Sequence, residues 1–292
     1  MSYTIKIVDI NDPVIDLAIR KLIRDTYHSP DLLPEKYLAA NLNSKASKPG
    51  FFLVAEEDNA IIGCTGFSPN DFSLNGKNCL GFQAFWSVTH PLHQGRKIYT
   101  SLINEGKIVA KERGGGFLYA IANPKARKTL ITKIGFQDMP ALRLRIPNIP
   151  FIKGLYFTKG VIQNRQNVCT IDELQVKDHK LAQDPSALKM VQVNESWIWG
   201  KRLQKTKFGI RIPVFYVGGI HLADEKDLKG LISGIFKLHK VFAIQFVSCK
   251  TNTFNGLMKG WKQSDMIYFN YCNWDMPAFE HFDLMIGALD VF

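Results

Sequence analysis

A short polar loop between an apolar strand and a helix carries the clearest chemistry in this sequence. The first backbone N–H groups of a helix have no partner inside it, and the helix dipole favours negative charge at that end. A glycine in the loop, Gly95, lets the backbone approach a ligand closely. The pattern predicts an anion site, with a solvated loop as the alternative. Its candidate residues are Val88, Gln94, Gly95, Arg96, Lys97, Ile98 and Tyr99.

The elements that would position this loop follow from the hydrophobic pattern. We expect a long strand over about 79–88, a helix over about 98–113 ended by three glycines, and a buried strand over 117–122. A strand–helix–strand unit crosses over in a right-handed sense, so its two strands should be parallel. An alternating segment at 3–8, a helix from Pro13, and a hairpin of 51–55 with 60–67 precede them. The predicted fold class is α/β, an α+β arrangement on a mixed sheet.

This loop resembles the acyl-CoA loop of the GNAT superfamily of N-acetyltransferases, which reads Gln/Arg-x-x-Gly-x-Gly/Ala. Gln94 matches the first position, Lys97 stands where a glycine is usual, and Tyr99 fits a branch with an aromatic residue at the end. The segment from Ala120 to Pro124, followed by Lys133-Ile-Gly-Phe136, resembles a second family motif. The resemblance covers about residues 1–145. It implies an acyl-CoA co-substrate, usually acetyl-CoA, with Asn123 touching its pantetheine arm.

The catalytic groups expected from the resemblance are less clear. Many GNAT enzymes place a tyrosine acid where this chain has Ile131, and a carboxylate base on the long strand, which here offers only Gln83, Ser87 and Thr89. His90 lies just past that strand and is the one candidate base, with a role-free loop histidine as the alternative. Direct attack of an amine on a thioester needs little beyond positioning and a polarised carbonyl. The catalytic residues therefore stay unassigned.

Composition and charge narrow the class of protein. The net charge of +11 is spread evenly, at +6 over residues 1–150 and +5 over 151–292, which suits an anionic small ligand and argues against a basic tail. The five cysteines form no C-x-x-C pair and indicate reduced thiols without a metal site. The first twelve residues lack a signal-peptide core, and no run of about 18 apolar residues occurs. We therefore expect a cytoplasmic protein that binds no metal and does not insert into a membrane.

The second half repeats part of the first at an offset of 125 residues. Phe117 to Asn123 aligns with Phe242 to Ser248, and Gly135-Phe136 aligns with Gly260-Trp261. The counterpart of the loop, around residues 219–222, has no Arg or Lys, so we expect no CoA there. We expect a GNAT-like acyl-CoA-binding domain over 1–145, a linker over 146–165, and a second α/β domain over 166–292 that is a degenerate GNAT repeat. Within it the pattern predicts a helix at 196–204, a strand at 211–219, a helix at 228–238 and a strand at 241–247.

Three functions remain open at this point. The leading one is an acyl-CoA-dependent N-acyltransferase, an acetyltransferase, acting on a small amine or amino-sugar acceptor. The second is an aminoacyl-tRNA-dependent transferase of tandem-GNAT type, since the positive charge would suit a phosphate backbone. The third is a non-catalytic GNAT-fold binding protein, favoured by Ile131 and by the strand without carboxylates. No helix-turn-helix pattern is visible, so we expect no nucleic-acid partner other than tRNA.

Overall fold

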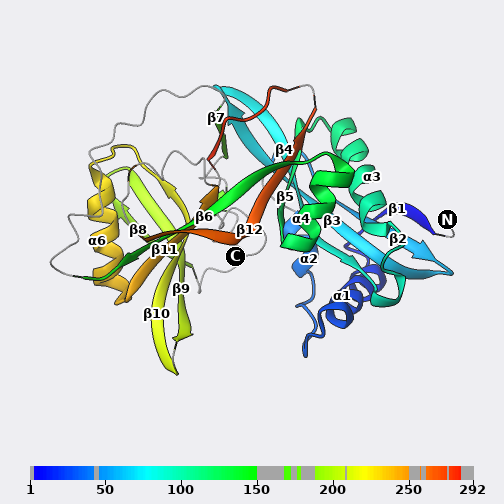
Figure 1. Cartoon of the computed structure of the whole chain (residues 1–292), viewed down its shortest axis with the longest axis horizontal. Helices are drawn as coiled ribbons and strands as arrows, with labels where there is room; N and C mark the ends of the chain where they lie inside the picture. The colour runs from blue at the N-terminus through cyan, green and yellow to red at the C-terminus, as the bar shows by residue number, and fades with distance from the viewer. Residues whose placement is uncertain are drawn as a thin grey trace. The chain divides into compact units, whose positions relative to one another are not determined.

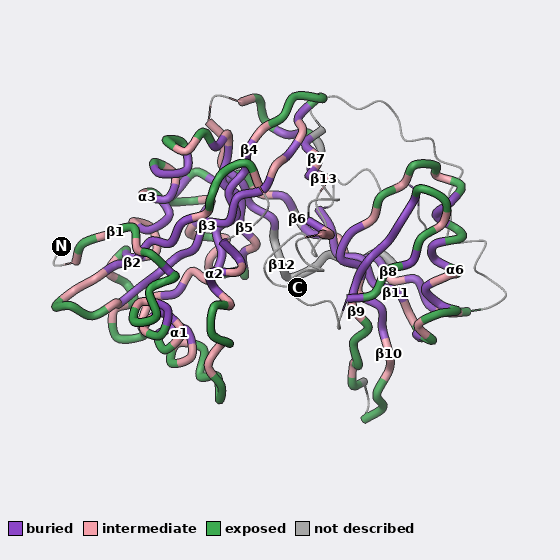
Figure 2. Tube along the Cα trace, turned by 180° about the vertical axis from the view of Figure 1, so that it is seen from behind, coloured by how far each residue is buried: buried purple, intermediate pink, exposed green. Residues whose placement is uncertain are grey.

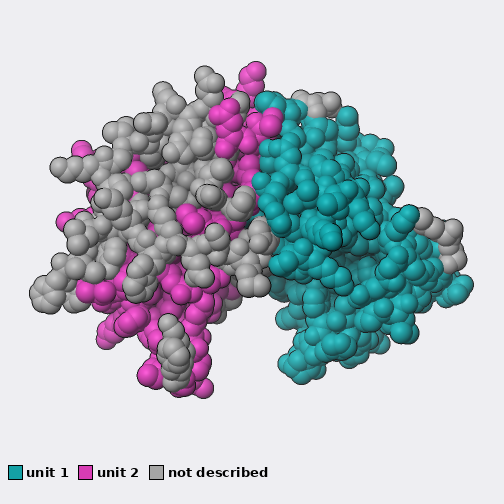
Figure 3. Space-filling view, in the orientation of Figure 1, with its two compact units in different colours: residues 1–72, 78–138, 268–277 teal, residues 73–77, 139–267, 278–292 magenta. Residues whose placement is uncertain are grey.

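The chain divides into two compact units (Figure 3). The computed structural model describes residues 3–42, 46–149, 168–171, 176–178, 188–207, 209–249, 257, 261–274 and 276–283. Unit 1 comprises residues 1–72, 78–138 and 268–277, and unit 2 comprises 73–77, 139–267 and 278–292. The domain limits expected from the sequence stay a prediction, and most of the expected linker, from residue 150 to 165, lies outside the described residues.

Unit 1 is a mixed sheet with helices on both faces (Figure 1). Its elements are β1 (Thr4–Val8), α1 (Pro13–Tyr27), α2 (Tyr37–Leu42), β2 (Phe51–Glu57), β3 (Ala60–Leu74), β4 (Lys77–Thr89), the 3-10 turn η1 (Pro91–His93), α3 (Ile98–Glu112), β5 (Phe117–Ala122), α4 (Pro124–Thr129) and the π-helical turn η2 (Leu130–Ile134). The strand order is β1-β2-β3-β4-β5-β12. β1, β2 and β3 are antiparallel neighbours, whereas β4 and β5 are parallel as expected. The mixed α/β class predicted from the sequence is confirmed.

Two apolar layers hold these helices on the sheet of unit 1. α3 packs Leu102 and Ile103 against Phe82 and its neighbours on one face. α1 packs Ile19 and Leu22 with residues of β2 and β3 on the other face. Figure 2 shows the buried residues running along the central strands. Burial of both faces explains why β2 and β5 are apolar almost throughout rather than alternating.

Local signals in the sequence set the start of α1. Asp12 is the N-cap, and its Oδ1 accepts a hydrogen bond of 2.8 Å from the backbone N–H of Val14, while Pro13 occupies the first helical position. This is the capping chemistry that the sequence predicted. The helix ends at His28, whose φ of 51° lies in the left-handed region.

Unit 2 carries its own sheet in the order β6-β11-β10-β9-β8. Its elements are β6 (Gln137–Pro147), β7 (Val168–Ile171), β8 (Leu188–Val193), β9 (Ser196–Lys207), β10 (Ile210–His221), α6 (Asp227–His239), β11 (Ala243–Cys249), β12 (Trp261–Asn273) and β13 (His281–Asp283). β10 and β11 are parallel and joined through α6, and β9 is antiparallel to β10. This is the same order of pairing as β4, α3 and β5, so the expected echo of strands 117–122 and 242–248 falls on β5 and β11. Gly260 of the alignment lies outside the described residues.

The sheet of unit 1 takes one strand from far along the chain. Tyr268–Asn273 of β12 pair antiparallel with β5 in unit 1. β6, which directly follows the α4–η2 segment in sequence, pairs antiparallel with β11 in unit 2. The sheet of unit 1 is therefore not formed by a continuous stretch of sequence.

One expected element is wrong. Residues 196–204, predicted as a helix, belong to the strand β9. The start of β9 is covered on both faces, with Trp197 at 8%, Ile198 at 0% and Trp199 at 0% exposure. Such a strand shows no alternation of apolar and polar residues, and its pattern is easily taken for a buried helix. The expected strand at 211–219, helix at 228–238 and strand at 241–247 are confirmed as β10, α6 and β11.

Candidate functional site

The parallel pair β4 and β5 separates part-way along its length. The ladder joins Gly81–Ala84 to Phe117–Ala120, and among the described residues it continues no further. β4 runs on to Thr89, while β5 runs on to Ala122 with β12 as its partner. The edge of β4 beyond Ala84 is therefore not used by β5, and an extended ligand with amide groups could pair with it.

A strained residue marks the point where the ladder ends. Trp86 of β4 has a φ of 46°, which is unusual for a bulky side chain. Its indole Nε1 is buried, and no described residue accepts a hydrogen bond from it. The rings of Tyr27 and Tyr37 lie edge-on to it, with centroid distances of 6.2 and 6.4 Å. Strain and an unpaired buried donor at one residue are typical of functional sites rather than of ordinary strands.

The loop between β4 and α3 has the geometry of an anion site. Gly95 has a φ of 82°, and a Cβ built there meets no atom within 4 Å. Lys97 is the N-cap of α3 at a φ of 63°, and its side chain makes no capping hydrogen bond. The N–H groups of the first turn of α3, a 15-residue helix, are thus left to other acceptors. Both the open space beside Gly95 and the helix dipole favour a ligand with negative charge at this end.

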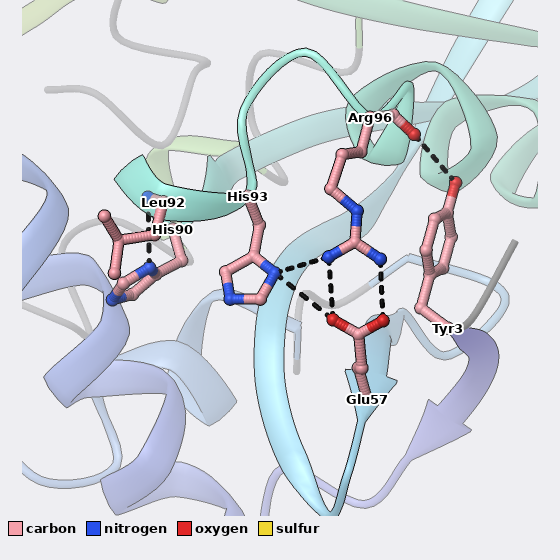
Figure 4. A network of polar contacts seen from close by, with 6 residues as sticks. All are labelled: Tyr3, Glu57, His90, Leu92, His93 and Arg96. Carbon is pink, nitrogen blue, oxygen red and sulfur yellow. Dashed lines mark hydrogen bonds and ion pairs between the residues drawn. The ribbon is translucent and has the colours of Figure 1, made fainter.

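Arg96 is bound to Glu57 and keeps part of its side chain exposed (Figure 4). Its two terminal nitrogens donate to Glu57 Oε2 at 2.7 Å and Oε1 at 2.6 Å, and the first of them also contacts His93 Nδ1 at 2.7 Å. The hydrogen bonds that Arg96 donates to Glu57 raise the pKa of Arg96. From the other side, the hydroxyl of Tyr3 donates to the carbonyl oxygen of Arg96 at 3.4 Å and lies 3.1 Å from Ser101 Oγ. The guanidinium therefore braces the loop, and its charge is matched by a carboxylate.

The remaining candidate residues divide between backbone and cap roles. Val88 is 4% and Ile98 1% exposed, so both side chains belong to the core and only their backbone faces the loop. The phenol of Tyr99 is largely buried, which raises its pKa. Gln94 and Lys97 are exposed. Asn123 caps α4, its Oδ1 accepting from the N–H of Ala126 at 2.9 Å.

These candidates come together because β4 and β5 are parallel. The two strands end at the same edge of the sheet, so the loop after β4 and Asn123 after β5 share that edge. The sequence did not single out Glu57, Tyr3 or Trp86. Glu57 sits in a charged turn that reads as solvent-exposed, and nothing in its spacing points to Arg96, 39 residues away.

His90 has a structural task in this arrangement. Its Nδ1 accepts a hydrogen bond of 3.3 Å from the backbone N–H of Leu92 and so caps η1. That bond assigns the ring proton to Nε2 in the neutral form. The nitrogen that would accept a proton from an amine is thus already engaged. Within the described residues, no three His, Cys, Asp or Glu side chains are grouped so as to hold a metal ion.

The equivalent helix end in unit 2 carries a carboxylate of the protein in its first turn. Asp227, in the first turn of α6, accepts hydrogen bonds of 2.8 Å from Asn194 Nδ2 and from the hydroxyl of Ser196. Ser196, fully buried, in turn accepts the N–H of Ala223 at 2.9 Å. The helix dipole favours a negative charge in this first turn, and the expectation that no CoA binds there stays a prediction.

The comparison with known families decides the nature of unit 1. Residues 17–136 match the sequence model of the acetyltransferase (GNAT) family. These residues form a GNAT acetyltransferase domain. They include the β4–α3 loop and the end of β5 in full. A comparison with curated protein sequences finds no match.

Solved structures extend the likeness beyond the GNAT domain. A GCN5-related N-acetyltransferase from Kribbella flavida aligns with 92% of this chain and 71% of its own, at 9% identity and a TM-score of 0.62. A GCN5-related N-acetyltransferase from Anabaena variabilis covers 92% and 72% at 10% identity and a TM-score of 0.63. Eis1 from Mycobacterium abscessus covers 91% and 72% at 12% identity and a TM-score of 0.56. At these identities the likeness concerns the fold alone, and it includes most of the second half.

Proposed function

We propose that this protein is an acyl-CoA-dependent N-acyltransferase, most simply an acetyltransferase, that acts on a small amine. One observation carries the proposal: the first turn of α3 has no side-chain cap, and in the loop just before it a Cβ built on Gly95 would meet no protein atom within 4 Å. A diphosphate fits that arrangement of N–H groups and dipole. The GNAT family match over residues 17–136 supports acyl-CoA as the source of that diphosphate.

The rest of the co-substrate would lie along β4. The β4–β5 ladder ends at Ala84, so the backbone groups that follow could pair with the amides of a pantetheine arm. Asn123, whose carbonyl caps α4, would offer its amide N–H groups from the neighbouring strand end. The thioester would then lie between the ends of the two strands.

The chemistry asks for little from ionisable side chains. The neutral amine attacks the thioester carbonyl carbon, a new C–N bond forms, the C–S bond breaks, and CoA leaves as a thiolate that takes up the amine's proton through solvent. Holding the amine and the thioester in the reactive orientation supplies a large part of the rate enhancement of an acyl transfer. The engaged Nδ1 of His90 and the apolar Ile131 are compatible with a site that works by positioning.

Product analysis tests this proposal. The purified protein is incubated with acetyl-CoA and a panel of amines and amino-sugars, and acetylated products are measured by mass spectrometry. We expect at least one product, abolished by Gly95→Trp and retained by Gly114→Trp. Gly114 offers a matched control, because its φ of 84° and the open space around it equal those of Gly95 while it lies past the far end of α3. Acetyl-CoA binding without any product would favour the non-catalytic alternative.

A further inference from the structure

A two-stranded arm extends from the sheet of unit 2. β9 and β10 pair from Trp197 with His221 out to Lys207 with Ile210, and Figure 1 shows them continuing past the neighbouring strands of the unit. Towards the tip the exposed fraction rises, to 43% at Leu203 and 66% at Ile210. From Arg202 to Lys207 the ribbon reaches roughly 17 Å at about 3.4 Å per residue. Among the described residues, β8 pairs with β9 only up to Lys201 and β11 pairs with β10 only from Val214. The outer part of the arm, from about residue 202 to 212, therefore has no neighbouring strand, whereas its base belongs to the packed sheet.

The arm is basic and carries no acid. Residues 196–221 contain Lys201, Arg202, Lys205, Lys207 and Arg211 and no Asp or Glu. The net charges of the two halves of the sequence are nearly equal, so they do not reveal this local excess of positive charge. Such a segment attracts a polyanion and repels other basic surfaces.

One face of the arm bears side chains of the types that can form hydrogen bonds with nucleic-acid bases. Arg202 lies opposite Phe215 in the ladder, and Arg211 lies opposite Thr206. Because alternate residues share a face, Arg202, Gln204, Thr206 and Arg211 lie on one side of the ribbon, and all four are exposed. Arg202 Nε donates to the carbonyl oxygen of His239 at 3.1 Å, and among the described residues no acceptor engages its two terminal amino groups.

The opposite face is anchored. Lys205 Nζ lies 4.8 Å from the ring centroid of Tyr216, a cation–π contact within one face of the ribbon. The arm therefore presents a polar, donor-rich face on a braced support.

We infer that this arm binds the major groove of duplex DNA. The groove is about 12 Å wide and 8.5 Å deep and admits a two-stranded ribbon. The ribbon's reach exceeds that depth, whereas the major groove of duplex RNA is too narrow for side chains to read. Arginine and glutamine are the side chains that pair with guanine and adenine edges there. This binding site is separate from the proposed acyl-CoA site and does not depend on it.

Fluorescence anisotropy with a labelled 20-bp DNA duplex tests the inference on the full chain. We expect binding whose logarithm falls with the logarithm of salt concentration at a slope of about −2, for the two arginines of the donor-rich face at about 0.9 each. Arg202→Gln with Arg211→Gln should reduce the slope by about two and weaken binding at 50 mM salt by about tenfold or more. Thr206→Glu, which removes no cation, should weaken binding as well.

Matched controls make the result decisive. Lys21→Gln with Lys229→Gln removes two exposed cations elsewhere and should keep the wild-type slope. The inference is overturned if wild-type protein does not bind the duplex at low salt, or if arm and control variants bind alike. Tighter binding of an RNA duplex of the same sequence, or displacement of the DNA by polyglutamate at equal charge, would overturn it equally.

Discussion

Gly106 lies mid-way along α3, where the helix packs directly on Phe67 of β3. A Cβ at this position would lie 2.0 Å from Phe67 Cζ, 2.4 Å from Cε1 and 2.8 Å from Cε2. Phe67 is fully buried and stacked on Phe51 with ring centroids 4.6 Å apart, so its ring has nowhere to turn. Alanine in place of glycine inside a helix normally stabilises by about 1 kcal/mol. Overpacking a core costs about 1–3 kcal/mol and occasionally more.

With three ring atoms inside 3 Å, we expect the clash to exceed the helix gain. Gly106→Ala should lower the free energy of unfolding by about 1–2 kcal/mol, or the melting temperature by roughly 2–8 °C. Thermal unfolding followed by circular dichroism measures it. Phe67→Leu should relieve the contact, so adding Gly106→Ala to that variant should raise its melting temperature. A Gly106→Ala single variant that melts above wild type would refute the close approach of α3 to the sheet.

Three further predictions concern the loop and unit 2. Lys97→Gly should raise the free energy of unfolding by about 0.5–1 kcal/mol, because glycine adopts a left-handed backbone without strain. Lys36→Gly, at a φ of 62°, is the control and should stabilise the protein similarly. Only the Lys97 variant should change the affinity for acetyl-CoA in calorimetry. Glu57→Gln should weaken acetyl-CoA binding by about two- to fivefold, because the loop before α3 loses its ion pair with Arg96. Tighter binding would show instead that the Glu57 carboxylate competes with the ligand. Glu56→Gln, at the neighbouring residue, serves as the control. Burial and two nearby cations lower the pKa of His239 below 6.5. The contribution of this histidine to stability is therefore complete above pH 6.5 and is lost as pH falls through the lowered pKa. In urea unfolding, the free energy of unfolding of His239→Gln should depend less on pH below 6.5 than that of wild type, and an unchanged profile would contradict this.

Much of unit 1 could be predicted from sequence because its signals are local. The cap at Asp12 and Pro13, the glycine-ended helix before 117, and the uninterrupted apolar run of β5 are each set within a few residues. The loop at the start of α3 was also recognisable, since its glycine and its place between strand and helix are sequence features. The left-handed backbone of Lys97 explains why a glycine would suit that position better.

What could not be predicted depends on contacts between distant residues. Glu57 and Arg96 meet because β2 and the loop converge in space, and the sequence offers only a charged turn and a basic loop. Arg96 was a candidate residue of the anion site, and the structure pairs its guanidinium with Glu57. The pairing of β12 with β5 likewise leaves no trace in local periodicity. β9 was misjudged because its first residues are buried on both faces, with Trp197 and Trp199 on one face and Ile198 on the other.

None of the helices in the described part of the chain combines the length and hydrophobicity needed to cross a bilayer.

Titration with acetyl-CoA in a calorimeter tests the central claim most directly. Wild type and Gly114→Trp should bind at micromolar concentration, and Gly95→Trp, with a ring filling the open side of the loop, should not. Equal binding by all three proteins would place the ligand elsewhere, and no binding to wild type would contradict the account of this loop as an acyl-CoA site.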